Sequence, residues 1–202
     1  MLIITPAFAS YSGLVIIPTA ETVGADQYSL EYQYNGVIQG ETANVNLLNT
    51  EIGIGNRFET GIDFGLSRDA DSFVLGNIKY LLYDKRDKAL GLGVYNWGSN
   101  IKSSPYITGL RDFGILRLHL GGIRIEGENQ WFVGTDRTFG KWTIVADYTS
   151  GEGNFSSAGL YYQVNDRLAI TAGAVFTNYS EESSFSLLFT YGAPYRSTER
   201  KK

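Results

Sequence analysis

The sequence predicts an all-β protein, more narrowly an antiparallel up-and-down transmembrane β-barrel of about 12 strands. Three observations lead to this fold class. Aromatic residues and glycine are abundant while proline is scarce, segments of about ten residues alternate between apolar and polar side chains, and the connections between these segments alternate in length.

The composition favours strands joined by turns. The chain has 24 Gly, 14 Tyr and 11 Phe but only 4 Pro in 202 residues, and no linker divides it, so one domain is expected. The net charge of −4 offers no basic footprint for nucleic acid, and the absence of cysteine excludes thiolate metal sites and disulfides. No apolar run approaches the roughly 18 residues of a membrane helix, so a membrane would be crossed by strands.

The N-terminal 26 residues do not share the alternating pattern. Residues 1–9 are interpreted as the remnant of an export signal, because Ala7-Phe8-Ala9 fits the A-x-A cleavage pattern. Within residues 10–26, the stretch GLVIIPTA carries an unbroken aliphatic row from Leu14 to Ile17 that ends at Pro18. We expect this segment to precede the barrel as a plug or as a covering of its rim, with Pro18 ending any strand pairing. A first wall strand is the open alternative.

The barrel is expected to occupy residues 27–195, followed by a basic tail at 196–202. A typical strand is Phe58 to Leu66, in which Phe58, Ile62 and Phe64 alternate with Glu59 and Asp63. Fourteen strands remain the alternative count. The expected strands are 27–34, 44–55, 57–67, 73–83, 89–97, 105–111, 115–126, 130–137, 141–149, 155–164, 167–177 and 184–192.

The connections sort by parity along the chain. Those after even-numbered strands, such as GNR, DFG and NDR, are mostly tight, whereas those after odd-numbered strands, such as NGVIQGETA and WGSNIKSSP, are mostly longer and richer in Ser, Gly and Asn. Outer-membrane barrels have this asymmetry, with short periplasmic turns and longer external loops. It favours an even number of strands.

The two faces of the strands are expected to meet different surroundings. The polar face is mostly Gly, Ser, Thr and Asn rather than Lys and Glu, which suits a confined lumen better than a water-exposed sheet face. The interior of so wide a barrel would be poorly filled by apolar side chains, so the apolar face is expected to contact lipid. The expected lumen-facing residues are Glu31, Glu59, Asp63, Lys79, Arg111, Arg117, His119 and Asp147. The expected lipid-facing residues are Tyr32, Ile62, Phe64, Leu118, Ile144, Ile170 and Leu187.

Two stretches resemble YjbH-like outer-membrane proteins, a family linked to exopolysaccharide and capsule production. They are SGLVIIPTAETVGADQYSLEYQY and NIKYLLYDKRDKALGLGVYNWGSNIKSSPYITGLRDFGILRLHLGGIR. The resemblance covers about half of the chain, and its motifs occur in order. Members of this family are usually much longer, so the chain resembles a single barrel module. The resemblance implies a barrel in the outer membrane with a role in polysaccharide production or export.

The residues that could be catalytic or metal-binding are better explained by structural roles. His119 is the only histidine, and no G-x-S-x-G motif accompanies it. Glu59 and Asp63 project from one strand in the same direction, so they cannot easily flank a glycosidic bond. The acidic turns that contain Asp69, Asp71, Asp84 and Asp87 lack EF-hand spacing, and no glycine-rich run precedes a helix. We therefore expect no enzyme, no bound metal and no cofactor.

The sequence thus favours an outer-membrane β-barrel of a diderm bacterium, either associated with exopolysaccharide or acting as a narrow channel. Its expected partners are outer-membrane lipid, the barrel-assembly machinery and, as a further candidate, polysaccharide. A soluble ligand-binding β-barrel is the leading alternative. An outer-membrane enzyme that modifies lipid or glycan is the third.

Overall fold

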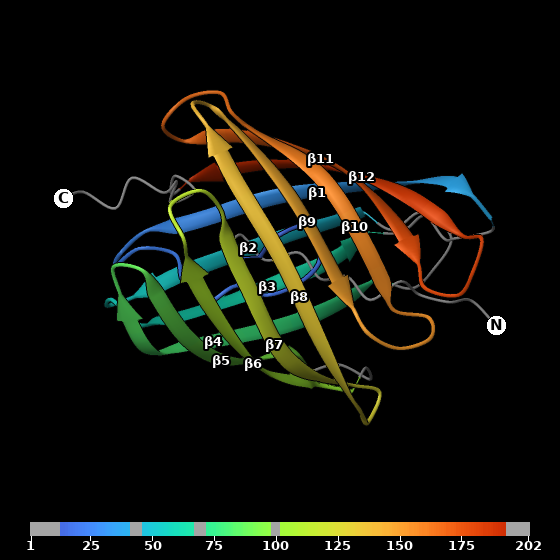
Figure 1. Ribbon diagram of the computed structural model, residues 1–202, viewed down its shortest axis with the longest axis horizontal. Helices are drawn as coiled ribbons and strands as arrows, with labels where there is room; N and C mark the ends of the chain where they lie inside the picture. Colours follow the sequence, from blue (N-terminus) through green and yellow to red (C-terminus); the bar gives the residue numbers. More distant parts are fainter. Residues whose placement is uncertain (1–12, 41–45, 67–71, 98–101, 193–202) are drawn as a thin grey trace.

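The computed structural model describes residues 13–40, 46–66, 72–97 and 102–192, and in these residues the chain forms one closed barrel of twelve strands (Figure 1). These residues include no helix that is long and apolar enough to cross a membrane. The strands are β1 (Tyr28–Gln39), β2 (Asn46–Ile54), β3 (Phe58–Leu66), β4 (Phe73–Lys85), β5 (Lys88–Trp97), β6 (Ser104–Asp112), β7 (Arg117–Ile125), β8 (Glu128–Phe139), β9 (Trp142–Thr149), β10 (Phe155–Gln163), β11 (Leu168–Thr177) and β12 (Ser183–Gly192).

Every strand pairs with its neighbours in the sequence, and the barrel closes where β1 pairs with β12. This antiparallel seam aligns Glu31 with Thr190 and Tyr32 with Phe189. The prediction of an up-and-down barrel with twelve strands is confirmed. A fourteen-stranded barrel and a wall strand at residues 13–20 are both wrong, since β1 is already paired on both edges.

The connections give the barrel two different ends. Connections 55–57, 86–87, 113–116, 140–141 and 164–167 lie at one end, which we call the turn end. Strands β1, β3, β5, β7, β9 and β11 terminate at the other end, the loop end, and the connections that follow them in the sequence are 40–45, 67–72, 98–103, 126–127, 150–154 and 178–182. The expected difference in length fails between β7 and β8, where Glu126 and Gly127 alone make the turn. Both have positive φ values, of 52° and 98°, which is the backbone shape of a tight hairpin turn.

The alternation of side chains places apolar residues outside and a mixed set inside. Ile144 on β9 is 54% exposed, whereas its neighbours Thr143 and Val145 are buried in the lumen. The same alternation runs along the other strands, with outward Tyr, Phe, Leu and Ile residues. A soluble barrel, which buries its apolar face inside, does not fit this arrangement.

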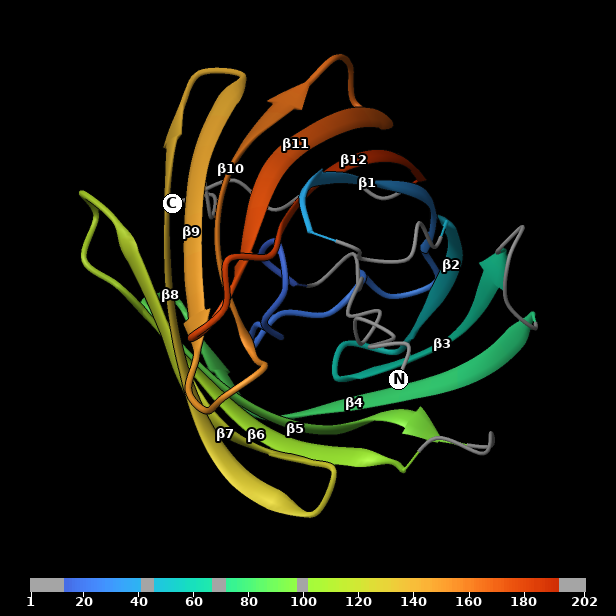
Figure 2. The ribbon, with the colours of Figure 1, turned by 90° about the vertical axis from the view of Figure 1, so that its right-hand side faces the viewer.

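Residues 13–23, which precede β1, lie inside the barrel rather than in its wall. Figure 2 looks into the barrel from the loop end and shows this segment, in dark blue, surrounded by the strands. We call residues 13–26 the N-terminal plug. Most of its side chains from Val15 to Val23 are buried, including Thr19 at 0% exposure.

Several expectations concern residues outside the described ranges. They are the export-signal remnant at 1–9, the basic tail at 196–202, and the loop residues Asp69 and Asp71.

Candidate functional site

The tip of the N-terminal plug is a small apolar hairpin that fills part of the lumen. Gly13 and Pro18 form an isolated bridge, and the amide of Leu14 donates to the carbonyl of Ile17 at 3.0 Å. Because the two chain ends of this turn pair with each other, the aliphatic side chains between them point outward against the wall. The row Leu14 to Ile17 is therefore the packing surface of the plug.

The hairpin packs against two clusters of apolar side chains on the lumen wall. Ile17 contacts a cluster on β5 to β8, and Val15 contacts a cluster on β9 to β11. Burying these side chains stabilises the plug through the hydrophobic effect. The wall residues of the two clusters are Tyr95, Tyr106, Ile123 and Phe132 in the first, and Val145, Phe155 and Val175 in the second.

Asp147 on β9 holds the backbone of the hairpin. Its Oδ2 accepts the amide N–H groups of Val15 at 2.9 Å and Ile16 at 3.0 Å, and its Oδ1 accepts the hydroxyl of Ser157 at 2.6 Å. A buried backbone N–H without a partner is costly, so these bonds remove the main penalty of placing irregular chain in the lumen. Asp147 is therefore an anchor for the plug.

A second anchor lies nearer the turn end, where Glu21 of the plug meets charged wall residues. Arg117 on β7 donates from Nη1 to Glu21 Oε1 at 2.8 Å and from Nη2 to Asp136 Oδ2 at 2.9 Å. His119 Nε2 lies 2.7 Å from the other Asp136 oxygen. The guanidinium thus joins one carboxylate of the plug to one of the wall in a buried, charge-assisted network.

A third anchor combines a wall ion pair with the plug backbone. Lys79 Nζ on β4 lies 3.2 Å from Glu59 Oε1 and donates to the carbonyl of Glu21 at 2.9 Å. Glu59 Oε2 accepts the amide of Val23 at 2.6 Å, and Thr108 donates its hydroxyl to the carbonyl of Pro18 at 3.1 Å. We call Glu21, Glu59, Lys79, Arg117, His119, Asp136 and Asp147 together the plug network.

A different set of side chains lines the lumen across β12, β1, β2, β3 and β4. We call Thr190, Glu31, Asn49, Asp63 and Asn77 the polar row. Thr190 and Asn49 donate to the two oxygens of Glu31 at 2.8 and 3.2 Å, and Asn77 donates to Asp63 Oδ2 at 2.5 Å. All five are buried, and none of their described hydrogen bonds involves the plug. The plug network and the polar row meet on β3 and β4, and of these two groups only the plug network has side chains that bind the plug.

The structure places the sequence-predicted lumen residues as follows. Buried on the lumen side are Glu31, Glu59, Asp63, Lys79, Arg117, His119 and Asp147. Arg111 is a correction: Tyr106, Thr108 and Leu110 of β6 face inward, so Arg111 projects outward, where it pairs with Asp87 at 2.7 Å. The error arose because Arg111 was assigned by its charge rather than by the alternation of its strand.

The predicted lipid-facing residues all lie on the outward side of their strands. Tyr32, Ile62, Phe64 and Ile144 are exposed, and Leu118, Ile170 and Leu187 are half-buried between outward neighbours.

Sequence reasoning missed several residues that hold the plug. Glu21 lies in the segment without alternation, and Asp136 was not selected although it shares a face with Phe132 and Gly134. The apolar lumen residues were also missed. A signal for them exists, since Val145, Val175 and Leu188 are apolar residues on the face that is otherwise polar.

The described residues do not assemble a nucleophile and base. His119 Nε2 contacts Asp136, its Nδ1 is buried without a partner, and the buried Ser157 bonds to Asp147 instead. Within the described ranges, no three His, Cys, Asp or Glu side chains converge in a way that could hold a metal ion. What this arrangement can do is bind an internal segment and present acceptors to the remaining lumen.

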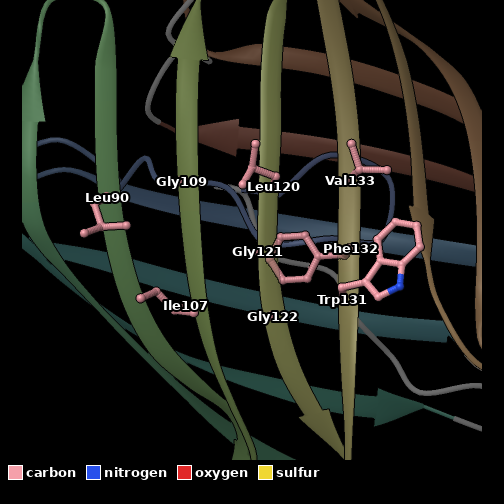
Figure 3. Close-up of a pocket in the computed structure, with 9 residues that line it drawn as sticks. All are labelled: Leu90, Ile107, Gly109, Leu120, Gly121, Gly122, Trp131, Phe132 and Val133. Carbon is pink, nitrogen blue, oxygen red and sulfur yellow. The ribbon is translucent and has the colours of Figure 1, made fainter.

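The outer wall carries a shallow apolar hollow of about 440 Å³ on β5 to β8 (Figure 3). Gly109 and Gly122 leave space between Leu90, Ile107, Leu120 and Trp131, and the ring of Phe132 lies behind the wall at Gly121. All the side chains that line it are apolar, so it offers no group for chemistry.

Comparisons with known proteins identify the architecture. The KdgM porin aligns with a TM-score of 0.65 over 81% of this chain and 98% of its own, at 12% identity. The chain has the porin fold. The NanC porin aligns with a TM-score of 0.58 over 84% of this chain and 100% of its own at 10% identity, and Omp33 of Acinetobacter baumannii with 0.55 over 82% and 97% at 11%. KdgM has also been solved in complex with disordered oligogalacturonate. No family model and no curated protein sequence matches the chain.

Proposed function

We propose that this chain is an outer-membrane β-barrel of a diderm bacterium whose lumen is a narrow channel restricted by the N-terminal plug. The observation that carries this proposal is the plug itself, bound inside a closed twelve-stranded barrel by buried charges and apolar contacts. A barrel of this strand number encloses a lumen that side chains alone do not fill. The plug decides how much of that lumen is open.

The outer surface supports the membrane location. Its exposed residues are aromatic and aliphatic along the strands, as lipid contact requires. Aromatic pairs lie near both ends: Trp131 and Tyr148 near the loop end, with ring centroids 5.2 Å apart, and Trp142 and Tyr162 at the turn end, 4.3 Å apart. Such girdles are favoured where the bilayer meets water. In a membrane, acyl chains would fill the hollow shown in Figure 3.

The charge of the lumen restricts the solutes that would pass. The buried charged residues among those described are the acids Glu21, Glu31, Glu51, Glu59, Asp63, Asp136 and Asp147 and the bases Lys79 and Arg117. This excess of carboxylates disfavours a polyanion such as the oligogalacturonate seen with KdgM. We therefore propose the exopolysaccharide role that the sequence resemblance implies only for an uncharged saccharide.

A disulfide lock tests whether the plug restricts conduction. The chain has no cysteine, so Val15→Cys with Gly173→Cys introduces a single pair. A Cβ added at Gly173 would lie 3.1 Å from Val15 Cγ1, near the spacing that a disulfide needs. Single-channel currents in planar bilayers should stay low in the oxidised form and show larger openings after reduction. Equal currents in both forms, and in a variant that lacks residues 13–22, would rule out a restricting plug.

Solute preference is tested by liposome swelling. The reduced variant should admit neutral oligosaccharides faster than oligogalacturonate of similar length. Faster uptake of the anion would contradict the charge argument while leaving the barrel and its plug intact.

A further inference from the structure

The buried carboxylates of the lumen fall into two groups by the partners they have. Glu21 and Asp136 bind Arg117, Glu59 binds Lys79, and Asp147 accepts backbone N–H groups of the plug. Glu31 and Asp63 accept hydrogen bonds only from neutral amide and hydroxyl groups among the residues that the structure describes. Neither carboxylate therefore has a cationic side chain as a partner among the described residues.

These two carboxylates lie in one line across the sheet. The register aligns Thr190 with Glu31, Glu31 with Asn49, and Asn49 with Asp63, so four adjacent strands present them side by side. Neighbouring strands are about 4.8 Å apart. Asn49 therefore stands between the two acids, within reach of both.

The oxygen atoms in this line are not fully used. Asn49 donates its amide nitrogen to Glu31 Oε1 at 3.2 Å, so its Oδ1 takes no part in that bond. Asn49 Oδ1 and Asp63 Oδ1 are both buried without a hydrogen-bond donor, and each residue is only 2% exposed. Nearby on β1, Ser29 Oγ and Gln33 Oε1 are also buried and unpartnered.

A cation satisfies this arrangement better than a hydroxyl donor does. Sugar hydroxyls or water could donate to the free oxygens, but they would leave the two buried charges without compensation, which is costly in a confined site. A cation both neutralises charge and accepts the oxygen lone pairs. Carboxylate and amide oxygens are the ligands that hard cations such as Ca²⁺ prefer, with water completing the shell.

We propose that Glu31, Asn49 and Asp63 form a binding site for a hard divalent cation on the inner face of β1, β2 and β3. The site offers two carboxylates and one amide oxygen, which agrees with the finding that no three acidic or histidine side chains converge within the described ranges. It stands whether or not the barrel conducts.

Calcium-dependent stability of the full chain in detergent micelles tests the site. The midpoint of thermal unfolding, read from heat-modifiable gel mobility after chelation and readdition of CaCl₂, should rise saturably. The expected rise is about 5–10 °C at a free Ca²⁺ concentration one hundred times Kd. Choline chloride at matched ionic strength is the control for screening.

Three substitutions sharpen the result. Asp63→Asn and Glu31→Gln should abolish the calcium-dependent rise, and either suffices if the other fails to fold. Asn49→Asp adds a third carboxylate and should lower the half-saturating Ca²⁺ concentration at least tenfold. Asp166→Asn, in an exposed turn, should leave the rise unchanged.

The proposal is overturned by any of three outcomes: no calcium-dependent rise in the wild type, an equal rise with choline, or an undiminished rise in both Asp63→Asn and Glu31→Gln. The channel currents measured with the disulfide-locked variant are unaffected by these outcomes, so the two proposals fail separately.

Discussion

The plug network and the polar row are two groups of residues in one lumen, and their buried carboxylates have different kinds of partner. In the plug network, Arg117 is shared between Glu21 and Asp136, and each carboxylate has a cationic or backbone partner. In the polar row, Glu31 and Asp63 have only neutral partners among the described residues. The difference teaches that the plug completes the partners of the plug network, whereas the polar row keeps buried oxygen acceptors without a donor among the described residues.

The largest effect is expected from breaking the plug network at Asp136. Asp136→Asn leaves Arg117 and His119 without their shared carboxylate in a buried site, which should cost about 3–5 kcal/mol of folding free energy. Urea unfolding in lipid vesicles without divalent cations measures it. The same substitution at Asp63 is the matched control and should cost clearly less, because no ionic partner is lost. Equal losses would remove the distinction between the plug network and the polar row.

Charged substitutions on the outward side of the strands test whether these side chains face lipid. Leu118 lies one residue from Arg117, on the opposite side of β7. Leu118→Arg and Ile170→Lys should each destabilise the inserted barrel by about 2–4 kcal/mol if they lie near the bilayer midplane. Leu118→Phe, which stays apolar, serves as the control. Membrane insertion and vesicle unfolding that are unchanged in both charged variants would show that these side chains do not face lipid.

Weakening the apolar packing of the plug should have a smaller effect. Ile17→Val removes one buried methylene between the plug and Phe132, and should cost about 0.5–1.5 kcal/mol through the cavity it leaves. Ile144→Val makes the same change on the outward face and should cost less, since lipid can fill the space. The two unfolding midpoints in urea decide the matter, and a larger loss at Ile144 would contradict the packing of the plug.

The smallest effect is expected at the corrected residue, Arg111. Its ion pair with Asp87 joins side chains that are 47% and 46% exposed, so solvent screens the attraction. Arg111→Ala should therefore cost about 0.2–1 kcal/mol. A double-mutant cycle with Asp87→Ala measures the coupling. A coupling as large as that of Arg117 with Asp136 would mean that Arg111 is buried in the folded protein.

The strands of the wall could be predicted from the sequence because the alternation of their side chains depends only on neighbouring residues. Alternation has a period of two, so a residue such as Ile62 reveals its face through its neighbours, and twelve such segments determine the closed barrel. The outward orientation of Arg111 follows the same alternation. Applying the alternation of Tyr106, Thr108 and Leu110 would have assigned it correctly.

The interior could not be predicted in the same way. The contact between Val15 and Asp147 joins residues 132 positions apart, and nothing in their local sequence pairs them. Likewise, Glu21 finds Arg117 only after the wall has closed around the plug. The unbroken aliphatic row did mark the segment as unlike a wall strand, but its partners depend on the three-dimensional arrangement of seven separate strands, β5 to β11.

Three glycines on the inner wall lie where the plug packs against it. A Cβ at Gly134 would come within 2.6 Å of Leu14 and Ile17, and one at Gly159 or Gly173 within 3.1 Å of Val15. These three positions on β8, β10 and β11 have no side chain where the aliphatic row packs against the wall. The positions of these glycines thus match the shape of the plug. Other inward glycines, such as Gly61 and Gly93, lie against wall atoms instead, so only those whose added Cβ would meet the plug mark where it packs.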